Sequence, residues 1–231
     1  MHLVFRLADD PLRVFNDQDD QQGNVVSTMV VGGARAGFYI RDVTRPLCSV
    51  GAQLRPGAAQ SLFGVDADEL SGRHTALEDI WGAAAESIRA ELAAAPSIDS
   101  RLDRFECLLA ERLPVVRGLH PAVAQALQQF TTSASVGAVV RSTGYSHRRF
   151  IALFSRSVGL TPKAYCRVQR FQDVLRRARR DWRSLIDIAA DAGYSDQSHF
   201  TREFREFAGI TPTDYRDRAP AFPHHVPVPP R

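Results

Sequence analysis

Two stretches of this sequence carry side chains that can form hydrogen bonds with nucleic acids. Residues 148–156 contain three arginines, and residues 197–205 combine arginine with glutamine, serine, histidine and threonine. A guanidinium can donate two parallel hydrogen bonds to guanine, and a glutamine amide can pair with the edge of adenine. Other arginines bind phosphate oxygens. The candidate contact residues, including one alanine that can touch a thymine methyl group, are Arg148, Arg149, Ala152, Arg156, Gln197, Ser198, His199, Thr201, Arg202 and Arg205.

An internal repeat places these residues at equivalent positions. Apolar residues spaced i, i+3, i+4 and i+7 precede Gly144-Tyr145-Ser146, and the same spacing precedes Gly193-Tyr194-Ser195, 49 residues later. Two phenylalanines then follow in each copy at a separation of 50 residues, so the second copy has one inserted residue after its serine. The paired phenylalanines are Phe150 and Phe200, and Phe154 and Phe204.

Each copy predicts a helix, a tight turn and a second helix. The glycine can take the positive φ that a turn at a helix end needs. Ser146 and Ser195 are expected to cap the second helices, because a serine hydroxyl can accept a hydrogen bond from a free backbone N–H. The phenylalanines should pack on the first helix and leave the polar face outward. That face could be a mere solvated surface, but its recurrence in both copies favours contact with DNA.

A single helix is expected to connect the two copies. Thr161-Pro162 is typical of a helix start, and the apolar spacing predicts a helix over Lys163–Arg180. Its length of about 26 Å would suit two outward helices that lie about 34 Å apart, one turn of DNA. The arginine pairs 176–177 and 179–180 could bind phosphate or form the exposed face of this helix.

The charge distribution supports a polyanionic partner for one half of the chain only. Residues 1–131 hold 12 arginines and 17 acidic residues, a net charge of −5, whereas residues 132–231 hold 17 basic and 9 acidic residues, a net charge of +8. No apolar run reaches the length of about 18 residues expected of a membrane span, and no signal peptide is evident. The three cysteines, without metal-ligand spacing, are expected to be reduced. These features predict a cytoplasmic protein without membrane contact.

The N-terminal half predicts a small β-rich part followed by helices. Strands are expected at Leu3–Leu7, Val25–Val31 and Cys48–Leu54, and helices at Ala83–Ala94 and Ser100–Leu113. Because the chain opens directly in a strand, part of this domain is expected to be missing. The fold class is α+β, with three expected segments: a regulatory or dimerisation domain at 1–116 (β-rich 1–57, helical 58–113), a DNA-binding domain at 117–218, and a disordered proline-rich tail at 219–231.

The second copy resembles a known family of bacterial regulators. The run from Gly193 to Phe200, followed by Gly209-Ile210-Thr211-Pro212 and Tyr215-Arg216, is similar to the AraC/XylS family over residues 120–218. The resemblance implies an all-α domain of seven helices with two helix-turn-helix units in adjacent major grooves of bent or tilted DNA. It places base contacts on Arg148, Ala152, Gln197, Ser198, His199 and Arg202. Family members often have a long polar residue where this chain has Ala152, so the first unit is expected to read fewer bases.

The resemblance also bears on the N-terminal half. Many such regulators carry a cupin-like barrel there that senses a small molecule or dimerises, and residues 51–57, 63–65, 77 and 81–82 resemble a domain of unknown function that precedes these modules. Residues 1–54 supply few strands for a barrel, and no ligand is named by the resemblance. The expected function is a sequence-specific transcriptional regulator with a small-molecule effector. The expected partners are promoter DNA, RNA polymerase and a second copy of the chain.

Two other functions compete with this interpretation. A global or architectural regulator would use its N-terminal half only to dimerise. A DNA-repair alkyltransferase would need an activated cysteine, but Cys48 is interpreted as a core residue and Cys166 lies on the connecting helix. We expect no catalytic residue, metal or cofactor. The remaining isolated candidates are interpreted as a loop residue, a core aromatic and an exposed pair in the tail, namely His74, Trp81 and His224-His225.

Overall fold

The computed structural model describes residues 1–17, 19–43, 48–113, 118–132, 135–178, 185–218 and 224–227. These residues form two units. Residues 1–35 and 39–162 make up the first, and residues 36–38 and 163–231 make up the second. The first copy of the repeat therefore belongs to the same unit as the N-terminal half, and the second copy belongs to the other unit.

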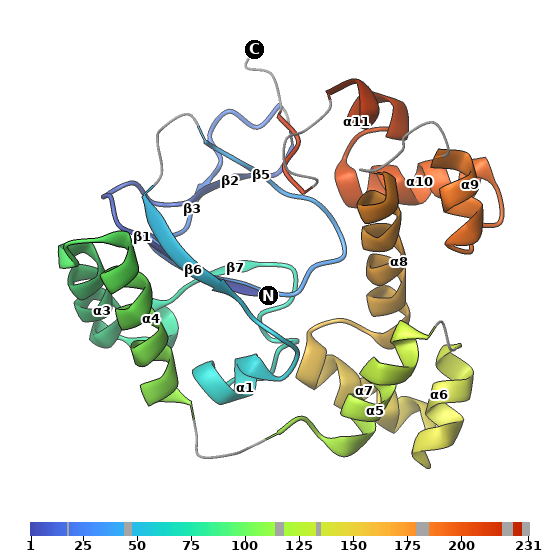
Figure 1. The fold of residues 1–231 in the computed structure, drawn as a ribbon, viewed down its shortest axis with the longest axis horizontal. Coiled ribbons are helices and arrows are strands. Elements are labelled where there is room, and N and C mark those ends of the chain that lie inside the picture. The colour runs from blue at the N-terminus through green and yellow to red at the C-terminus, as the bar shows by residue number, and fades with distance from the viewer. Residues whose placement is uncertain are drawn as a thin grey trace. The chain divides into compact units, whose positions relative to one another are not determined.

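Two antiparallel sheets form the N-terminal part of the first unit (Figure 1). The four-stranded sheet has the order β6-β1-β4-β7, and the three-stranded sheet has the order β3-β2-β5. The strands are β1 (His2–Arg6), β2 (Arg13–Phe15), β3 (Asn24–Val25), β4 (Met29–Gly32), β5 (Ile40–Arg41), β6 (Ser49–Gln53) and β7 (His74–Ala76).

The mixed fold class is confirmed, but the observed strands differ from the predicted ones. The predicted run Val25–Val31 is divided between β3 and β4, because the Ser27 hydroxyl between them accepts a hydrogen bond from the backbone N–H of Met29. The expectation that His74 lies in a loop was wrong, since it begins β7. Strands of two or three residues are too short for a periodic pattern to reveal them, which explains why β2, β5 and β7 were missed.

One face of the four-stranded sheet carries the core of this region. Leu3 and Phe5 of β1 are fully buried and belong to one cluster with residues of α3 and α4. The ring of Phe5 meets that of Phe105 edge to face, with 6.0 Å between centroids. Figure 1 shows α3 and α4 side by side next to β1 and β6. The helices of this region are α1 (Ala58–Phe63), α2 (Glu78–Trp81), α3 (Ala83–Ala94) and α4 (Ile98–Arg112).

The helices end at residues whose chemistry explains the boundaries. α3 has the predicted bounds, and α4 begins two residues earlier than predicted because Ser97 and Ser100 form a capping box. Trp81 packs against the core, as expected, and donates a hydrogen bond from Nε1 to the Leu62 carbonyl. Cys48, expected in the core, is instead exposed, because it precedes β6 at the end of the sheet.

The remaining helices correspond to the seven expected in the C-terminal region, as far as the structure describes it. α5 to α7 belong to the first unit, and α8, apart from its first residue, and α9 to α11 belong to the second. The predicted connecting helix is present to Ala178; Arg179 and Arg180 lie outside the described residues. The helices are α5 (Pro121–Thr131), α6 (Val136–Thr143), α7 (His147–Val158), α8 (Pro162–Ala178), α9 (Leu185–Asp191), α10 (Gln197–Ala208) and α11 (Pro212–Arg218).

The proline-rich tail is described only at residues 224–227. There Val226 packs against the core of the second unit, and Arg218 donates a hydrogen bond to the Pro227 carbonyl at 2.7 Å. His224 and His225 are exposed, and the described residues contain no group of three or more potential metal ligands. No helix among the described residues is long and apolar enough to cross a membrane.

Candidate nucleic-acid interface

The first helix-turn-helix unit is formed by α6 and α7. Gly144 ends α6 with a φ of 73°, and the Ser146 hydroxyl accepts a hydrogen bond from the backbone N–H of Arg149. Phe150 and Phe154 of α7 are fully buried, and the ring of Phe154 meets that of Phe130 in α5. The glycine turn, the serine cap and the buried phenylalanines were all predicted, and the structure confirms them.

The outward face of α7 presents its candidate residues to solvent. Arg148, Arg149, Ala152 and Arg156 are exposed. The guanidinium of Arg149 lies over the ring of Tyr145, 5.4 Å from its centroid, which restricts where that charge can reach. This face therefore combines cations that can bind phosphate with one small apolar residue at its centre.

The C-terminal end of α7 is attached to the N-terminal region of the same unit. The Arg156 Nε donates to the Asp66 carboxylate at 2.7 Å. The backbone N–H of Ala67 donates to the Arg156 carbonyl at 2.7 Å, and that of Gly57 donates to the Ser157 carbonyl at 2.9 Å. Arg156 thus already has an anionic partner, and contact with a phosphate would have to compete with it. This attachment could not be predicted from local patterns, because 90 residues separate Asp66 from Arg156.

The second unit contains the other helix-turn-helix, formed by α9 and α10. Gly193 has a φ of 85°, as a tight turn requires. The expectation that Ser195 caps α10 was wrong, because the cap is the inserted residue, Asp196. Its carboxylate accepts a hydrogen bond from the backbone N–H of His199 at 2.7 Å, and Ser195 Oγ donates to the same carboxylate at 3.0 Å. These hydrogen bonds hold the pKa of Asp196 below its ordinary value.

The outward face of α10 gathers a different set of side chains. Phe200, Phe204 and Phe207 face inward and are buried, as predicted. On the other side, five of the six candidate residues on this helix line one shallow pocket at the surface, where amide, hydroxyl and guanidinium groups are presented together. They are Gln197, Ser198, Thr201, Arg202 and Arg205.

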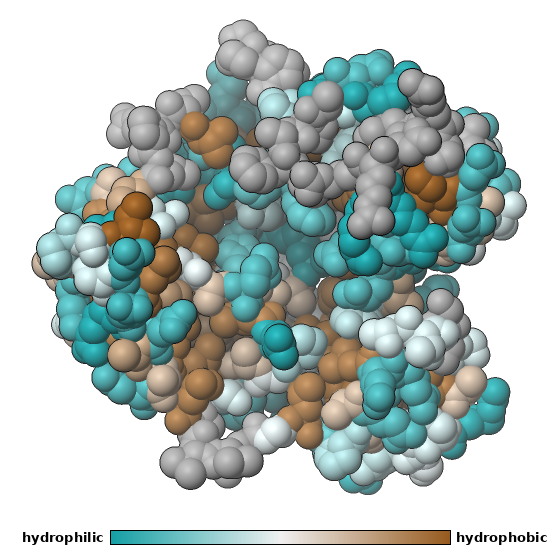
Figure 2. Space-filling model, in the orientation of Figure 1, coloured by the Kyte–Doolittle hydropathy of each residue, from teal (hydrophilic) through white to brown (hydrophobic). Residues whose placement is uncertain are grey.

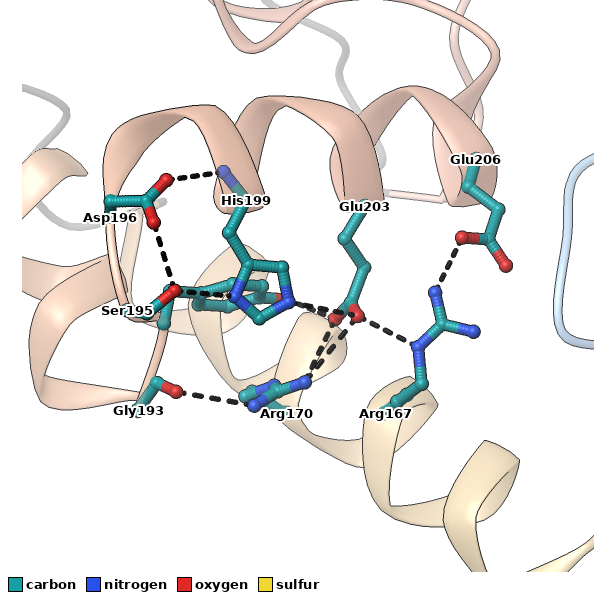
Figure 3. A network of polar contacts seen from close by, with 9 residues as sticks. Arg167, Arg170, Gly193, Ser195, Asp196, His199, Glu203 and Glu206 are labelled. Carbon is teal, nitrogen blue, oxygen red and sulfur yellow. Dashed lines mark hydrogen bonds and ion pairs between the residues drawn. The ribbon is translucent and has the colours of Figure 1, made fainter.

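A buried carboxylate holds α10 against α8. Glu203 is 3% exposed and accepts hydrogen bonds from Arg167 Nε at 2.8 Å and from the Tyr194 hydroxyl at 2.7 Å. Arg170 Nη2 lies 3.4 Å from the same carboxylate. Figure 3 shows Arg167 and Arg170 both directed toward Glu203. Burial alone would raise the pKa of Glu203, but the hydrogen bonds from Arg167 and Tyr194 outweigh it, so the pKa lies below its ordinary value.

His199 belongs partly to this network. Its Nδ1 lies 3.1 Å from Ser195 Oγ, and its Nε2 lies 3.9 Å from the Glu203 carboxylate (Figure 3). The side chain is 28% exposed, whereas the five pocket residues face outward. His199 therefore lies beside the candidate surface, and its ring is directed toward the buried carboxylate.

The network around Glu203 was not predicted, although the repeat contains one indication of it. Glu203 occupies the position that Leu153 occupies in the first copy, between two buried phenylalanines in each case. An acidic residue where the repeat has leucine indicates a buried charge that needs cationic partners. Arg167 and Arg170 are three residues apart on α8, which places them on one side of that helix.

The comparisons with known proteins concern the C-terminal region. Residues 123–218 match the family described as "Helix-turn-helix domain". An uncharacterised HTH-type transcriptional regulator of Haemophilus influenzae is 24% identical over 98 residues, which are 42% of this chain and 33% of the relative. The F1 operon positive regulatory protein of Yersinia pestis is 33% identical over 82 residues, 36% of this chain and 27% of the relative. The matches to these two relatives thus span a third of their length or less.

A shorter relative is matched over most of its length. Regulatory protein SoxS of Salmonella typhimurium is 33% identical over 84 residues, which are 36% of this chain and 78% of SoxS. No solved structure matches the chain. The matched residues include both helix-turn-helix units that the structure describes, with their glycine turns and buried phenylalanines. The chain belongs to the AraC/XylS family of helix-turn-helix regulators.

Proposed function

We propose that this protein binds specific sequences of double-stranded DNA and regulates transcription. One observation carries the proposal: α10 presents amide, hydroxyl and guanidinium groups on one exposed surface, while a buried carboxylate fixes the same helix to α8. A rigidly held helix keeps its side chains in register with the base edges, which direct readout in the major groove requires. The relatives are named as regulators, in agreement with this role.

The outward residues of α10 divide into base and phosphate contacts. Arg202 is exposed and lies at the centre of the helix face, so we assign it to a guanine edge. Gln197 and Ser198 are in the first turn, where a recognition helix usually contacts bases. Thr201 and Arg205 are assigned to the DNA backbone. His199 would reach a base only if its ring turned away from Glu203.

The outward residues of α7 support a weaker base readout. Arg148 is assigned to a base edge, and Ala152 to a thymine methyl group. Arg149 and Arg156 are assigned to phosphates, although Arg156 must first leave Asp66. The second unit is thus proposed to supply most of the sequence specificity, and the first unit to add affinity.

The experiment is selection of bound sequences from random DNA, followed by affinity measurements over a salt series. Arg202→Ala should weaken the selected site by about 1–3 kcal/mol and relax the preference at one base position. Arg104→Ala removes the same charge from α4, outside the proposed interface, and should leave both unchanged. Equal weakening of all sequences by Arg202→Ala would instead make Arg202 a phosphate contact. Failure to select any sequence would overturn the proposal.

The N-terminal half is proposed to control DNA binding, through a small-molecule effector, a second copy of the chain, or both. Support for self-association comes from α4, where Ile98 and Leu102 are 70% and 45% exposed and lie four residues apart. Figure 2 shows hydrophobic residues at the surface in this part of the molecule. RNA polymerase is a further proposed partner, and the cytoplasm is the proposed place of action. A regulator that only dimerises is distinguished by a metabolite screen, since an effector would raise thermal stability.

An alkyl-transfer activity has little support among the described cysteines. Such chemistry needs a thiol whose pKa is lowered by cations or a metal. Burial instead raises the pKa of Cys166. Cys48 and Cys107 are exposed, and the described residues hold no metal-ligand cluster. The proposed function is therefore binding rather than catalysis.

A further inference from the structure

A row of polar residues crosses the four-stranded sheet on the face opposite its core. In the register of the strands, Gln53 of β6 pairs with His2 of β1, His2 pairs with Gly32 of β4, and Gly32 pairs with His74 of β7. Directly paired residues in a sheet point to the same side. Leu3, the neighbour of His2, faces the hydrophobic core, so the two histidines face away from it.

The glycine in this row lets the two imidazoles approach each other. A Cβ at Gly32 would lie 2.1 Å from His2 Cε1, so the His2 ring would have to move from its present position. Without that Cβ, the His2 ring lies over the glycine, and the centroids of the His2 and His74 rings are 5.9 Å apart. Both side chains are half-buried.

An arginine and a tyrosine complete the cluster beside His74. The Tyr39 ring meets the His74 ring edge to face, with 4.5 Å between centroids, and the Arg35 guanidinium lies 4.8 Å from the centroid of Tyr39. Arg35 Nη2 donates to the Gly72 carbonyl at 2.6 Å and lies 3.5 Å from His74 Nδ1. Within the described part of the chain, Arg35 Nε and Nη1 have no hydrogen-bond acceptor.

The electrostatics of the cluster are uniformly positive. Burial, the terminal amino group, Arg41 of β5 and Arg35 lower the pKa of His2 to about 4. Burial and the charges of Arg35, His2 and Arg41 lower that of His74 to about 4. Within the described residues, no carboxylate contributes to the pKa of either histidine or of Arg35. Both imidazoles are therefore neutral at pH 7, and each keeps one N–H to donate.

We propose that His2, Arg35 and His74 form a binding site for a small molecule that carries an oxyanion, a carboxylate or a phosphate. The guanidinium supplies the positive charge and two N–H donors, at Nε and Nη1, that are not used by the Gly72 carbonyl. The imidazoles supply neutral donors beside it, and Arg41 adds a favourable potential. A metal ion fits less well, because the described residues around the two histidines form no group of three potential ligands.

The test uses the full-length protein without DNA. Thermal unfolding and titration calorimetry are run with sodium benzoate, citrate, phosphate and sulfate, each against sodium chloride of equal ionic strength, and separately with zinc chloride. A saturable rise in the melting temperature with one of these anions is expected. A benzoate or citrate response with none to phosphate identifies a carboxylate ligand, and the reverse identifies a phosphate. Absence of any response beyond chloride overturns the proposal, as does a response to zinc chloride alone.

Variants distinguish the site from a general salt effect. Arg35→Ala should weaken binding of the responding anion at least about 10-fold, because a charged hydrogen-bond donor is lost. Arg35→Lys keeps the charge but not the guanidinium donors and should retain part of the affinity. Arg104→Ala is the matched control on α4 and should bind normally. If Arg35→Ala unfolds, the imidazole resonances of His2 and His74 in the unaltered protein report binding directly, and unchanged resonances at saturating anion would refute the site.

The pH dependence has a definite sign. A bound anion favours the charged imidazoles and so raises the pKa of His2 and His74. By linkage, an anion whose own charge is constant over this range, such as benzoate or sulfate, must bind more tightly as the pH falls from 7 toward 5.5. Among the described residues, the titratable groups that act on these rings are Tyr39, Arg35, Arg41 and the terminal amino group, and none of them is a carboxylate that would oppose the effect. Weaker binding of benzoate or sulfate at the lower pH would contradict the assignment.

Only the role of this site as an effector site rests on the proposed function. Anion binding without any change in DNA affinity would support the site and refute its role as the effector site. Sequence-specific DNA binding without any anion binding would refute the site and support the regulator. The two proposals thus fail in different experiments.

Discussion

The two recognition helices have the same scaffold but are held in different ways. α7 and α10 each contain 12 residues, follow a glycine turn, and bury two phenylalanines four residues apart. At the position between those phenylalanines, α7 has a leucine and α10 has a glutamate. The turn tyrosines differ accordingly: the Tyr145 hydroxyl lies 3.4 Å from His120 Nε2, whereas the Tyr194 hydroxyl donates to Glu203.

The difference shows how a duplicated unit can acquire two roles without changing its fold. The hydrophobic contacts that form each helix-turn-helix are the same, so they fix the backbone of both. The polar contacts differ, because α7 is bound to Asp66 of the N-terminal region, whereas α10 is bound to the arginines of α8. The outward faces of the two helices also differ. Ala152 lies at the centre of the α7 face, and Arg202 lies at the centre of the α10 face.

The largest expected effect concerns the buried phenylalanines that the two units share. Phe154→Ala and Phe204→Ala each remove a fully buried ring and should each lower the free energy of unfolding by about 3–5 kcal/mol. Urea unfolding followed by circular dichroism measures both. Because both rings are 0% exposed, the two costs should be similar, and a cost under about 1 kcal/mol at either position would show that its core can rearrange to fill the space.

The second prediction tests the position at which the two units differ, which is Leu153 in α7 and Glu203 in α10. Glu203→Ala leaves Arg167 and Arg170 without their buried partner and should cost about 3–5 kcal/mol, whereas Glu203→Leu copies the first unit and should cost less. DNA binding by Glu203→Leu should lose sequence preference, because the buried hydrogen bonds between α8 and α10 would be lost and only the more exposed Arg167–Glu206 pair would remain. Leu153→Ala in the first unit is the control, with a smaller expected loss of preference. Full specificity in a stably folded Glu203→Leu protein would show that the network only supports folding.

The sequence predicted the shared features well and the distinguishing ones poorly. Apolar spacing, the glycines and the phenylalanines predict α6, α7, α9 and α10, because helix formation and core packing depend on residues close together in the chain. The attachment of Arg156 to Asp66 could not be predicted in this way, since it joins residues that only the fold brings together. The same holds for the row of His2, Gly32 and His74, which depends on the register of three strands.

A single inserted residue explains the wrong prediction at the start of α10. The alignment of the two copies made Ser195 equivalent to Ser146, but Asp196 follows it and is the better acceptor for a helix N-terminus, since its charge also favours the helix dipole. The serine then binds the carboxylate instead of the backbone. The insertion was visible in the repeat, but its effect depends on whether Ser195 or Asp196 caps the N-terminus of α10.

The caps provide a smaller and pH-dependent test of the comparison. The pKa of Asp196 is lowered in the folded protein, so its contribution to stability is present above the unfolded value of about 4 and is lost as the pH falls through the lower folded value. Asp196→Ala should therefore lower the melting temperature at pH 7 and have little effect at the acid end of this range. Ser146→Ala should cost about 1 kcal/mol at every pH, so parallel pH profiles of the two variants would contradict the assignment of the Asp196 cap.

The smallest expected effect concerns the C-terminal end of α7. Arg156 pairs with Asp66 at 2.7 Å, yet its side chain is 64% exposed, so the guanidinium can exchange this carboxylate for a DNA phosphate. Asp66→Ala should increase DNA affinity slightly and steepen its dependence on salt by about one counterion. Asp68→Ala removes a nearby exposed acid that makes no ion pair with Arg156 and controls for the change in net charge. If both variants have the same effect, only the overall electrostatic potential matters, and the first unit contacts DNA without Arg156. If Asp66→Ala alone raises the DNA affinity, the N-terminal region competes with DNA for α7. The second recognition helix, α10, has no such competitor among the described residues of its unit.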